Sequence, residues 1–284
     1  MNIIGKRPDG YHNLETVFFP VGIESGLPHQ PAPFDDIIDV SCDLSGVSGC
    51  RFQFMGRKID CAPGNNLVVK AATMFLKRYN DRYDDLAGYG MFRITLDKHL
   101  PEGAGMGGGS ADASFTLALL NEITGERFSR HELSHLAMKL GADCPFFLEN
   151  RPCFAEGIGE ILHPVDLNLK GYSLLIVKPD ISVSTAEAFS GIVPEKPDFD
   201  LRNLGYLPVK DWKEKVRNDF EKTVFRSHPE LGGIKQSLYD SGAEYASMTG
   251  SGSAIYGIYS DHSLATAQRE RLESTYDGVW LFSL

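Results

Sequence analysis

Apolar and polar residues alternate most regularly in residues 91–97, where Phe92, Ile94 and Leu96 are separated by single polar residues. This period of two is typical of a strand with one buried face. Shorter apolar stretches predict further strands at 174–177, 245–248, 254–259 and 279–282. In the first 60 residues we expect short strands and turns, with a turn at 7–10 and a loop rich in proline and glycine at 23–34.

Several other stretches have a helical period. Apolar residues three or four positions apart predict helices at 66–79, 110–122, 130–140, 212–225, 230–239 and 263–274. Asn65 or Asn66 is expected to cap the first, and Ser129 with Glu132 has the spacing of a capping box before the third. Because helices and strands alternate without βαβ units of uniform length, the pattern predicts an α+β fold. A later change of pattern predicts two domains, 1–163 and 164–284.

The composition limits the functions open to the chain. Its 284 residues are 42 % hydrophobic and 23 % charged, as in soluble globular proteins, and its net charge is −10. This charge argues against a nucleic-acid partner. The five scattered cysteines predict free thiols in a reducing compartment. No apolar run reaches the roughly 20 residues that cross a bilayer, so we expect a cytoplasmic protein without a membrane partner, as a monomer or weak homodimer.

Residues 101–111 contain five glycines between a predicted strand and a predicted helix. Glycines allow the backbone to fold around an anion, and the helix start adds N–H donors, so phosphate is the natural ligand. A flexible linker is the alternative. The absence of a lysine excludes a Walker loop. Gly103, Gly105 and Gly108 have the dinucleotide spacing G-x-G-x-x-G, but a dinucleotide-binding turn follows its strand directly and this loop does not.

This loop resembles the second motif of the GHMP kinases, and residues 249–254 resemble their third motif. Residues 5–12 and 14–18 resemble the signature of the GHMP kinases that act on 4-diphosphocytidyl-2-C-methyl-D-erythritol. Further matches to that signature lie at 66–68, 140–145, 155–160 and 218–221. The resemblance implies a two-domain GHMP kinase fold, with an N-terminal domain like domain 2 of ribosomal protein S5 and a ferredoxin-like C-terminal domain. It implies phosphorylation of the 2-hydroxyl of this cytidyl substrate, with ATP and Mg²⁺, in the non-mevalonate route to isoprenoid precursors.

The resemblance also implies the residues that hold ATP. Lys98 and Asn66 would lie on the nucleotide side, and Ser110 would lie near Mg²⁺. The phosphates would be held by one continuous loop of eleven residues: Pro101, Glu102, Gly103, Ala104, Gly105, Met106, Gly107, Gly108, Gly109, Ser110 and Ala111.

For the acceptor substrate, the resemblance implies that Asp143 takes the proton of the reacting hydroxyl. It implies that Tyr11 and His12 stack on and hydrogen-bond to cytosine, with Phe189, after Thr185, on the opposite ring face. The residues alone favour a solvated loop carboxylate for Asp143 and a core position for Phe189. For Tyr11 and His12 they allow equally well a turn with one buried ring and one surface ring.

One feature departs from the family pattern. GHMP kinases of this kind have a catalytic lysine in a Lys-x-Asn pattern shortly before the segment that matches residues 5–12, and this sequence has no counterpart. Lys6 belongs to the later motif. By analogy with the loss of one transition-state donor, we expect turnover reduced by about 10²–10³-fold with nucleotide binding retained.

A second pattern competes with this interpretation. Residues 131–135 read His-Glu-Leu-Ser-His, the spacing of a zinc protease helix. The apolar face of the same helix leaves both histidines toward its exposed side, which disfavours a zinc site. Three functions remain: the cytidyl-substrate kinase, another GHMP kinase such as one for mevalonate or homoserine, and a nucleotide-binding protein without catalysis.

Overall fold

The computed structural model describes residues 1–22, 35–43 and 48–284, so the loop expected at 23–34 lies outside the described residues. Contacts divide the chain into two compact units. The terminal unit comprises Met1–Gly22, Gly103–Met106 and Pro152–Leu284, and the central unit comprises the described residues of Ile23–Glu102 and Gly107–Arg151. This division differs from the boundary expected after residue 163, because a strand of the first 22 residues pairs with a strand that follows Pro152. The domain boundary itself stays a prediction.

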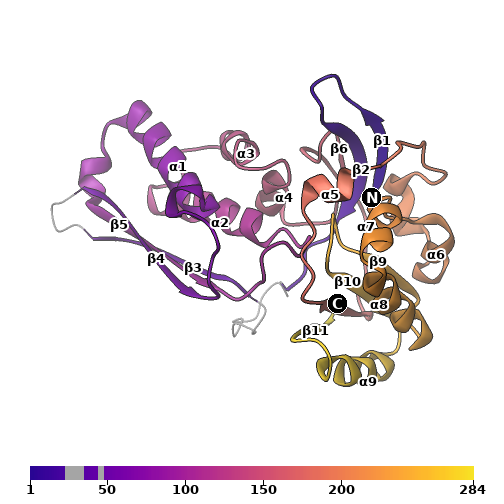
Figure 1. The fold of residues 1–284 in the computed structure, drawn as a ribbon. Helices are drawn as coiled ribbons and strands as arrows, with labels where there is room; N and C mark the ends of the chain where they lie inside the picture. Colours follow the sequence, from indigo (N-terminus) through magenta and orange to yellow (C-terminus); the bar gives the residue numbers. More distant parts are fainter. Residues whose placement is uncertain (23–34, 44–47) are drawn as a thin grey trace. The chain divides into compact units, whose positions relative to one another are not determined.

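The central unit contains a three-stranded sheet in the order β3-β5-β4. Its strands are β3 (Ile37–Asp43), β4 (Gly49–Gly56) and β5 (Met91–Lys98), with β3 antiparallel and β4 parallel to β5. The strand predicted at 91–97 is confirmed, and Phe92, Ile94 and Leu96 are buried on one face. Helices α1 (Leu67–Tyr83) and α2 (Gly108–Ile123) cover that face and share its core (Figure 1). The alternating pattern of β5 therefore fixes the side of the sheet on which both helices pack.

Two helix starts of the central unit follow their predicted caps. The side chain of Asn66 accepts a hydrogen bond from the Val68 N–H at 2.8 Å, at the start of α1. Helix α3 (Arg130–Met138) begins with the complete capping box of Ser129 and Glu132. The short helix α4 (Cys144–Glu149) follows α3 and was not predicted from the sequence. The 3₁₀ turns η1 (Pro63–Asn65) and η2 (Leu86–Tyr89) were not predicted either. Local capping chemistry thus placed the starts of α1 and α3 correctly.

The terminal unit contains two four-stranded sheets, β1-β2-β6-β7 and β11-β8-β10-β9. The first sheet consists of β1 (Asn2–Lys6), β2 (His12–Phe18), β6 (Cys153–Glu156) and β7 (Ile161–Pro164). The second consists of β8 (Ser173–Lys178), β9 (Tyr245–Met248), β10 (Ile255–Tyr259) and β11 (Gly278–Ser283). The turn predicted at 7–10 joins β1 to β2, where the Gly10 N–H donates to the Arg7 carbonyl at 3.1 Å.

The second sheet has a ferredoxin-like topology. All its neighbouring strands are antiparallel, and helices lie in the chain between β8 and β9 and between β10 and β11, which gives the order βαββαβ. Its helical elements are α5 (Thr185–Phe189), η3 (Leu201–Tyr206), η4 (Val209–Asp211), α6 (Trp212–Lys215), α7 (Phe220–Ser227), α8 (Pro229–Asp240) and α9 (His262–Glu273). Leu175 and Val177 of β8 join Leu231 and Leu238 of α8 in one buried core.

The single helix predicted at 212–225 was wrong. The structure has α6 and α7 instead, separated by residues 216–219, because Val216 takes an extended conformation and ends α6. The Asn218 side chain then accepts from the Phe220 N–H at 3.1 Å, so a new helix begins there. Across the described residues, no helix is both long enough and apolar enough to span a membrane.

Candidate functional site

The second half of the glycine loop leads into α2 without a capping side chain. Gly107 has a φ of 71°, and a side chain there would lie 2.7 Å from the Phe147 ring. The first hydrogen bond of the helix runs from the Ala111 N–H to the Gly107 carbonyl at 2.9 Å, so the N–H groups of Gly108 to Ser110 precede it. This glycine-rich, uncapped helix start fits a phosphate, because its N–H donors and the helix dipole both favour an anion.

The first half of the loop, Gly103–Met106, packs on the turn at 249–254 within the terminal unit. The Thr249 hydroxyl donates to the Gly105 carbonyl at 2.9 Å, and the Ala254 N–H donates to the Ala104 carbonyl at 3.1 Å. A Cβ atom on Gly105, whose φ is 71°, would lie 2.2 Å from the Thr249 carbonyl oxygen. The structure therefore brings together the two glycine-rich motifs, which lie far apart in the sequence.

Lys98 lies in a buried charge cluster with Asp36 and Asp112. Its ammonium group contacts Asp36 Oδ2 and lies 2.8 Å from Asp112 Oδ2, and all three side chains are almost fully buried. Burial lowers the pKa of Lys98, but the two carboxylates outweigh burial and raise it above its ordinary value. Burial raises the pKa of Asp112 to about 7; Lys98 opposes this shift, and Asp36 adds to it. One cation between two carboxylates therefore favours uptake of a proton.

This cluster lies under the start of α2. A Cβ atom on Gly108 would lie 3.3 Å from Lys98 Nζ and 3.5 Å from Asp36 Oδ2. Asp36 Oδ1 also accepts from the N–H groups of His99, at 2.6 Å, and Leu100, at 2.8 Å, which fixes the end of β5. The nucleotide contact expected of Lys98 stays a prediction, and the structure shows that its charge is already shared by two carboxylates.

Asp143 lies beside the same helix start. The Ser110 hydroxyl donates to Asp143 Oδ1 at 2.9 Å, and Oδ2 lies 3.7 Å from the position of a Cβ atom on Gly107. Burial raises the pKa of Asp143 above its ordinary value, and the Ser110 hydrogen bond offsets part of that rise. Asp143 is thus a half-buried carboxylate beside the uncapped start of α2, rather than a fully solvated loop residue.

Asn66 belongs to the central unit, whereas the four residues expected to bind the substrate belong to the terminal unit. Asn66 is buried and caps α1, and Leu67 beside it lies 3.7 Å from the position of a Cβ atom on Gly109. In the terminal unit, the rings of His12 and Phe189 stack directly, with centroids 4.8 Å apart and planes 20° from parallel. This spacing leaves no room for a base between those two rings. The Tyr11 ring is 61 % exposed, and Thr185 is exposed at the start of α5.

The histidines of the competing zinc motif are exposed on α3 and contact each other, with ring centroids 4.5 Å apart. Glu132 between them is engaged elsewhere, since it completes the capping box and lies 2.6 Å from the Arg82 guanidinium. Within residues 1–22, 35–43 and 48–284, no three His, Cys, Asp or Glu side chains are grouped to hold a metal ion. The glutamate of this motif therefore serves as the capping-box residue of α3.

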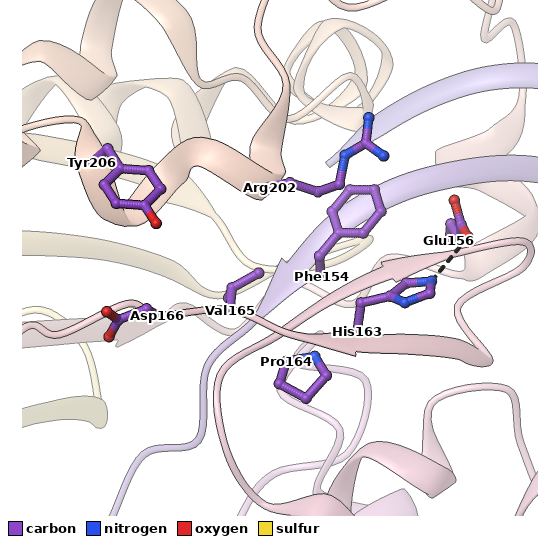
Figure 2. A pocket seen from close by; sticks show the side chains of 8 residues that line it. All are labelled: Phe154, Glu156, His163, Pro164, Val165, Asp166, Arg202 and Tyr206. Atoms are coloured by element: carbon purple, nitrogen blue, oxygen red, sulfur yellow. Dashed lines mark hydrogen bonds and ion pairs between the residues drawn. The ribbon is translucent and has the colours of Figure 1, made fainter.

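A pocket of about 380 Å³ lies between the β6–β7 hairpin and η3 (Figure 2). It is lined by Phe154, Glu156, His163, Pro164, Val165, Asp166, Arg202 and Tyr206. Two of its charged or polar side chains, Arg202 and His163, are paired with nearby carboxylates. Arg202 is bound by Asp200 at 2.8 Å and lies over the Phe154 ring, and His163 Nε2 lies 3.0 Å from Glu156. None of the predicted site residues lines this pocket.

Comparison with known proteins identifies the family. The model of the GHMP kinases N terminal domain matches residues 66–150, and that of the GHMP kinases C terminal region matches residues 208–278. A 4-diphosphocytidyl-2-C-methyl-D-erythritol kinase of Bacteroides thetaiotaomicron is 46 % identical over 259 residues, 91 % of this chain and 88 % of that protein. The chain belongs to the 4-diphosphocytidyl-2-C-methyl-D-erythritol kinase family. A member of this kinase family from Nitratidesulfovibrio vulgaris is 34 % identical over 96 % of this chain and 91 % of that protein.

Solved structures agree with this family assignment. The crystal structure of a 4-(cytidine 5'-diphospho)-2C-methyl-D-erythritol kinase has a TM-score of 0.78 and 29 % identity, covering 99 % of this chain and 93 % of that one. A homoserine kinase from Cytophaga hutchinsonii has a TM-score of 0.63 at 17 % identity and shares the fold. The predicted α+β, two-domain GHMP kinase fold and the kinase class are thereby confirmed.

Some residues that support the glycine loop were not found from the sequence. Asp36 lies 62 residues before Lys98, and no local pattern links the two. Asp112 lies within the loop-to-helix segment, but its type alone gives no sign that it is buried beside a lysine. Asn218 was noted only as part of a matching segment, although its side chain contacts the turn that holds Gly105. Each of these contacts depends on tertiary packing.

Proposed function

We propose that this chain transfers the terminal phosphoryl group of ATP to the 2-hydroxyl of 4-diphosphocytidyl-2-C-methyl-D-erythritol, a step in the non-mevalonate route to isoprenoid precursors. The observation that carries the proposal is the carboxylate of Asp143 at the uncapped start of α2, held by Ser110 at 2.9 Å. The names of relatives at 34–46 % identity support the choice of acceptor.

In this proposal the residues have separate roles. The N–H groups at Gly108 to Ser110 bind phosphate oxygens, because the first N–H groups of a helix have no intrahelical partner. Asp143 accepts the proton of the acceptor hydroxyl as its oxygen bonds to phosphorus and the bond from phosphorus to the leaving ADP oxygen breaks. Phosphoryl transfer needs mainly positioning and charge neutralisation, and such a site supplies both.

Mg²⁺ is part of this proposal. The cation usually takes one or two protein oxygens and fills its other positions with phosphates and water, and it neutralises charge on the transferred group. Ser110 Oγ and Asp143 Oδ1, 2.9 Å apart, offer two suitable oxygens beside the phosphate-binding helix start. The residues present therefore fit one cation held jointly with phosphates.

The cytidyl group would lie near Tyr11 and His12. Any base can stack on an aromatic face, whereas polar edges select among bases. Stacking on Phe189 holds the His12 imidazole in one plane, so that its edge is available for a hydrogen bond. The exposed Tyr11 ring supplies a stacking face. Because Phe189 already contacts His12, a base would stack on Tyr11 rather than between His12 and Phe189.

The decisive experiment is Asp143→Asn, assayed for ADP formation and for binding of a non-hydrolysable ATP analogue. We expect kcat to fall about 10²–10⁴-fold because the base is lost, while the Kd of the analogue changes little. Asp81→Asn, at an exposed position of α1, is the matched control and should leave both values unchanged. Activity of Asp143→Asn close to that of the unaltered chain would contradict the proposed role.

The same assay separates the alternatives left by the sequence. Three reactions each contain one acceptor, which is the cytidyl compound, mevalonate or homoserine, and a fourth reaction contains no acceptor. Product with only the cytidyl compound supports the proposal, whereas product with mevalonate or homoserine indicates another GHMP kinase. Analogue binding without product from any acceptor indicates a nucleotide-binding protein without catalysis.

A further inference from the structure

Asn218 lies in the break between α6 and α7, at the point where the sequence predicted a continuous helix. Its side chain is 5 % exposed, and every polar atom of its carboxamide is used. The amide nitrogen donates to the carbonyls of Met248 and Gly250, both at 2.8 Å, and the amide oxygen accepts from the Phe220 N–H at 3.1 Å. Asn218 is therefore fixed in one orientation between the helix start and the turn that follows β9.

The turn that Asn218 holds is the one on which Gly103–Met106 packs. Thr249 lies between the two carbonyls bound by Asn218, and its hydroxyl donates to the Gly105 carbonyl at 2.9 Å. At the far end of the turn, the Ala254 N–H donates to the Ala104 carbonyl at 3.1 Å. A continuous set of hydrogen bonds thus leads from Asn218 through residues 248–254 to the first half of the glycine loop.

Glu221, in the first turn of α7, supports the same strand end. Its Oε1 accepts from the Met248 N–H at 2.8 Å and from the Ser247 hydroxyl at 2.9 Å. Its Oε2 lies 2.5 Å from Lys235 Nζ, which balances its charge. Met248 is consequently held through both its N–H and its carbonyl. The end of β9 and the turn after it have little freedom to shift.

We propose that Asn218 is a positioning residue for ATP, acting through the 248–254 turn to hold Gly103–Met106 in the conformation that binds phosphate. The inference rests on the proposed kinase function. Asn218 is matched to this task because a carboxamide both donates and accepts. An aspartate of the same shape would lose both donors and place negative oxygen 2.8 Å from two carbonyl oxygens.

The test compares Asn218→Asp with Asn121→Asp. Asn121 is a matched control: it is 7 % exposed, donates to the Phe128 carbonyl at 3.0 Å and accepts from the Phe128 N–H at 2.9 Å, at the far end of α2. A purely structural loss lowers the Tm in both variants. We expect Asn218→Asp alone to raise the apparent KM and the analogue Kd for ATP about 10- to 100-fold, with kcat changed less than about threefold.

A readout without nucleotide accompanies the kinetics. The Ala254 amide is protected from hydrogen exchange by its bond to Ala104, so its exchange rate in the free chain reports the loop contact directly. We expect Asn218→Asp to accelerate that exchange at least about tenfold, and Asn121→Asp to leave it unchanged. Equal effects of the two variants on ATP affinity, or an unchanged Ala254 exchange rate in Asn218→Asp, would overturn the proposal.

If Asn218→Asp does not fold, a second pair of variants tests the link between the 248–254 turn and Gly103–Met106. Thr249→Val keeps the side-chain shape but removes the donor to Gly105, whereas Thr249→Ser keeps the hydroxyl. We expect the analogue Kd to rise about three- to tenfold in the valine variant and less than about twofold in the serine variant. Equal affinities would refute the inference. Analogue binding needs no turnover and can be measured in a chain without kinase activity. Absence of activity would therefore contradict the proposed function, while the comparison of affinities would still test this inference.

Discussion

The two halves of the glycine loop are held by different kinds of interaction. Gly103–Met106 is fixed by neutral hydrogen bonds, in which Thr249 and Ala254 bind its carbonyls and Asn218 braces the turn. The segment from Gly107 onward begins α2 above a buried cluster of one lysine and two aspartates. One glycine-rich sequence motif therefore has an uncharged support in one unit and a charged support in the other.

This difference has physical consequences. Neutral hydrogen bonds contribute modestly and similarly at every pH near neutrality. A buried cluster with an uneven number of charges is sensitive to pH and to the loss of one member, because an unpaired buried charge is costly. Changes to the central unit's support should therefore act mainly on stability and pH dependence. Changes to the terminal unit's support should act mainly on the geometry of the loop.

The largest effect is expected from Lys98→Met. The substitution leaves the buried carboxylates of Asp36 and Asp112 without their cation, and breaking such a cluster costs about 3–5 kcal/mol. Urea denaturation at neutral pH measures the free energy of unfolding. Lys70→Met, at an exposed position of α1, is the control and should change it little. A loss below about 1 kcal/mol in Lys98→Met would mean that the cluster is not the support described here.

The next effect is expected from Gly105→Ala. The new methyl group would lie 2.2 Å from the Thr249 carbonyl, and alanine is also unfavourable at a φ of 71°. We expect a loss of about 2–3 kcal/mol in stability, together with weaker binding of the ATP analogue. Gly109→Ala is the matched control in the other half of the loop, where the methyl group would meet Leu67 at an ordinary 3.7 Å. Equal losses of stability and of analogue binding in the two variants would contradict the close packing of Gly105 on the 249–254 turn.

The smallest effect is expected from Asp112→Asn and concerns pH. The pKa of Asp112 is raised to about 7 in the folded chain, so the folded state binds a proton more tightly than the unfolded state. This group therefore lowers the free energy of unfolding as pH rises from about 4 to about 7. Asp112→Asn should remove that decline, so its stability relative to the unaltered chain should grow by about 1–2 kcal/mol between pH 6 and pH 8.

Urea denaturation at several pH values tests this last prediction. Thr249→Val, on the neutral side of the comparison, should shift stability by the same amount at every pH. A pH slope that Asp112→Asn leaves unchanged would contradict the assignment of the titrating group to this cluster.

Local patterns predicted the fold where the structure depends on neighbours in sequence. The alternation at 91–97 and the caps at Asn66 and Ser129 were confirmed, because strand faces and helix starts are determined within a few residues. Helices α4 and α5 were missed, since six and five residues are too few to show a helical period. The break between α6 and α7 was also missed, because it depends on Asn218 reaching a turn 32 residues away.

Only part of the candidate site could be predicted from the sequence. The glycine loop could be interpreted from its composition, and the resemblance supplied Asp143, which the structure places beside Ser110. The supports of the loop could not be predicted, since Asp36 and Lys98 meet only after the sheet forms. The roles of Tyr11, His12, Thr185 and Phe189 stay predictions. The direct stacking of His12 on Phe189 was not expected.

The capping box of α3 also bears on the zinc-protease motif. A metalloprotease glutamate must take a proton from water near neutral pH, which requires a basic carboxylate. Hydrogen bonds from the Ser129 backbone and hydroxyl, with a further contribution from Arg82, hold the pKa of Glu132 at about 2. A carboxylate so acidic releases rather than takes protons throughout the physiological range. Supplying zinc to residues 131–135 would thus still leave the helix without a working base.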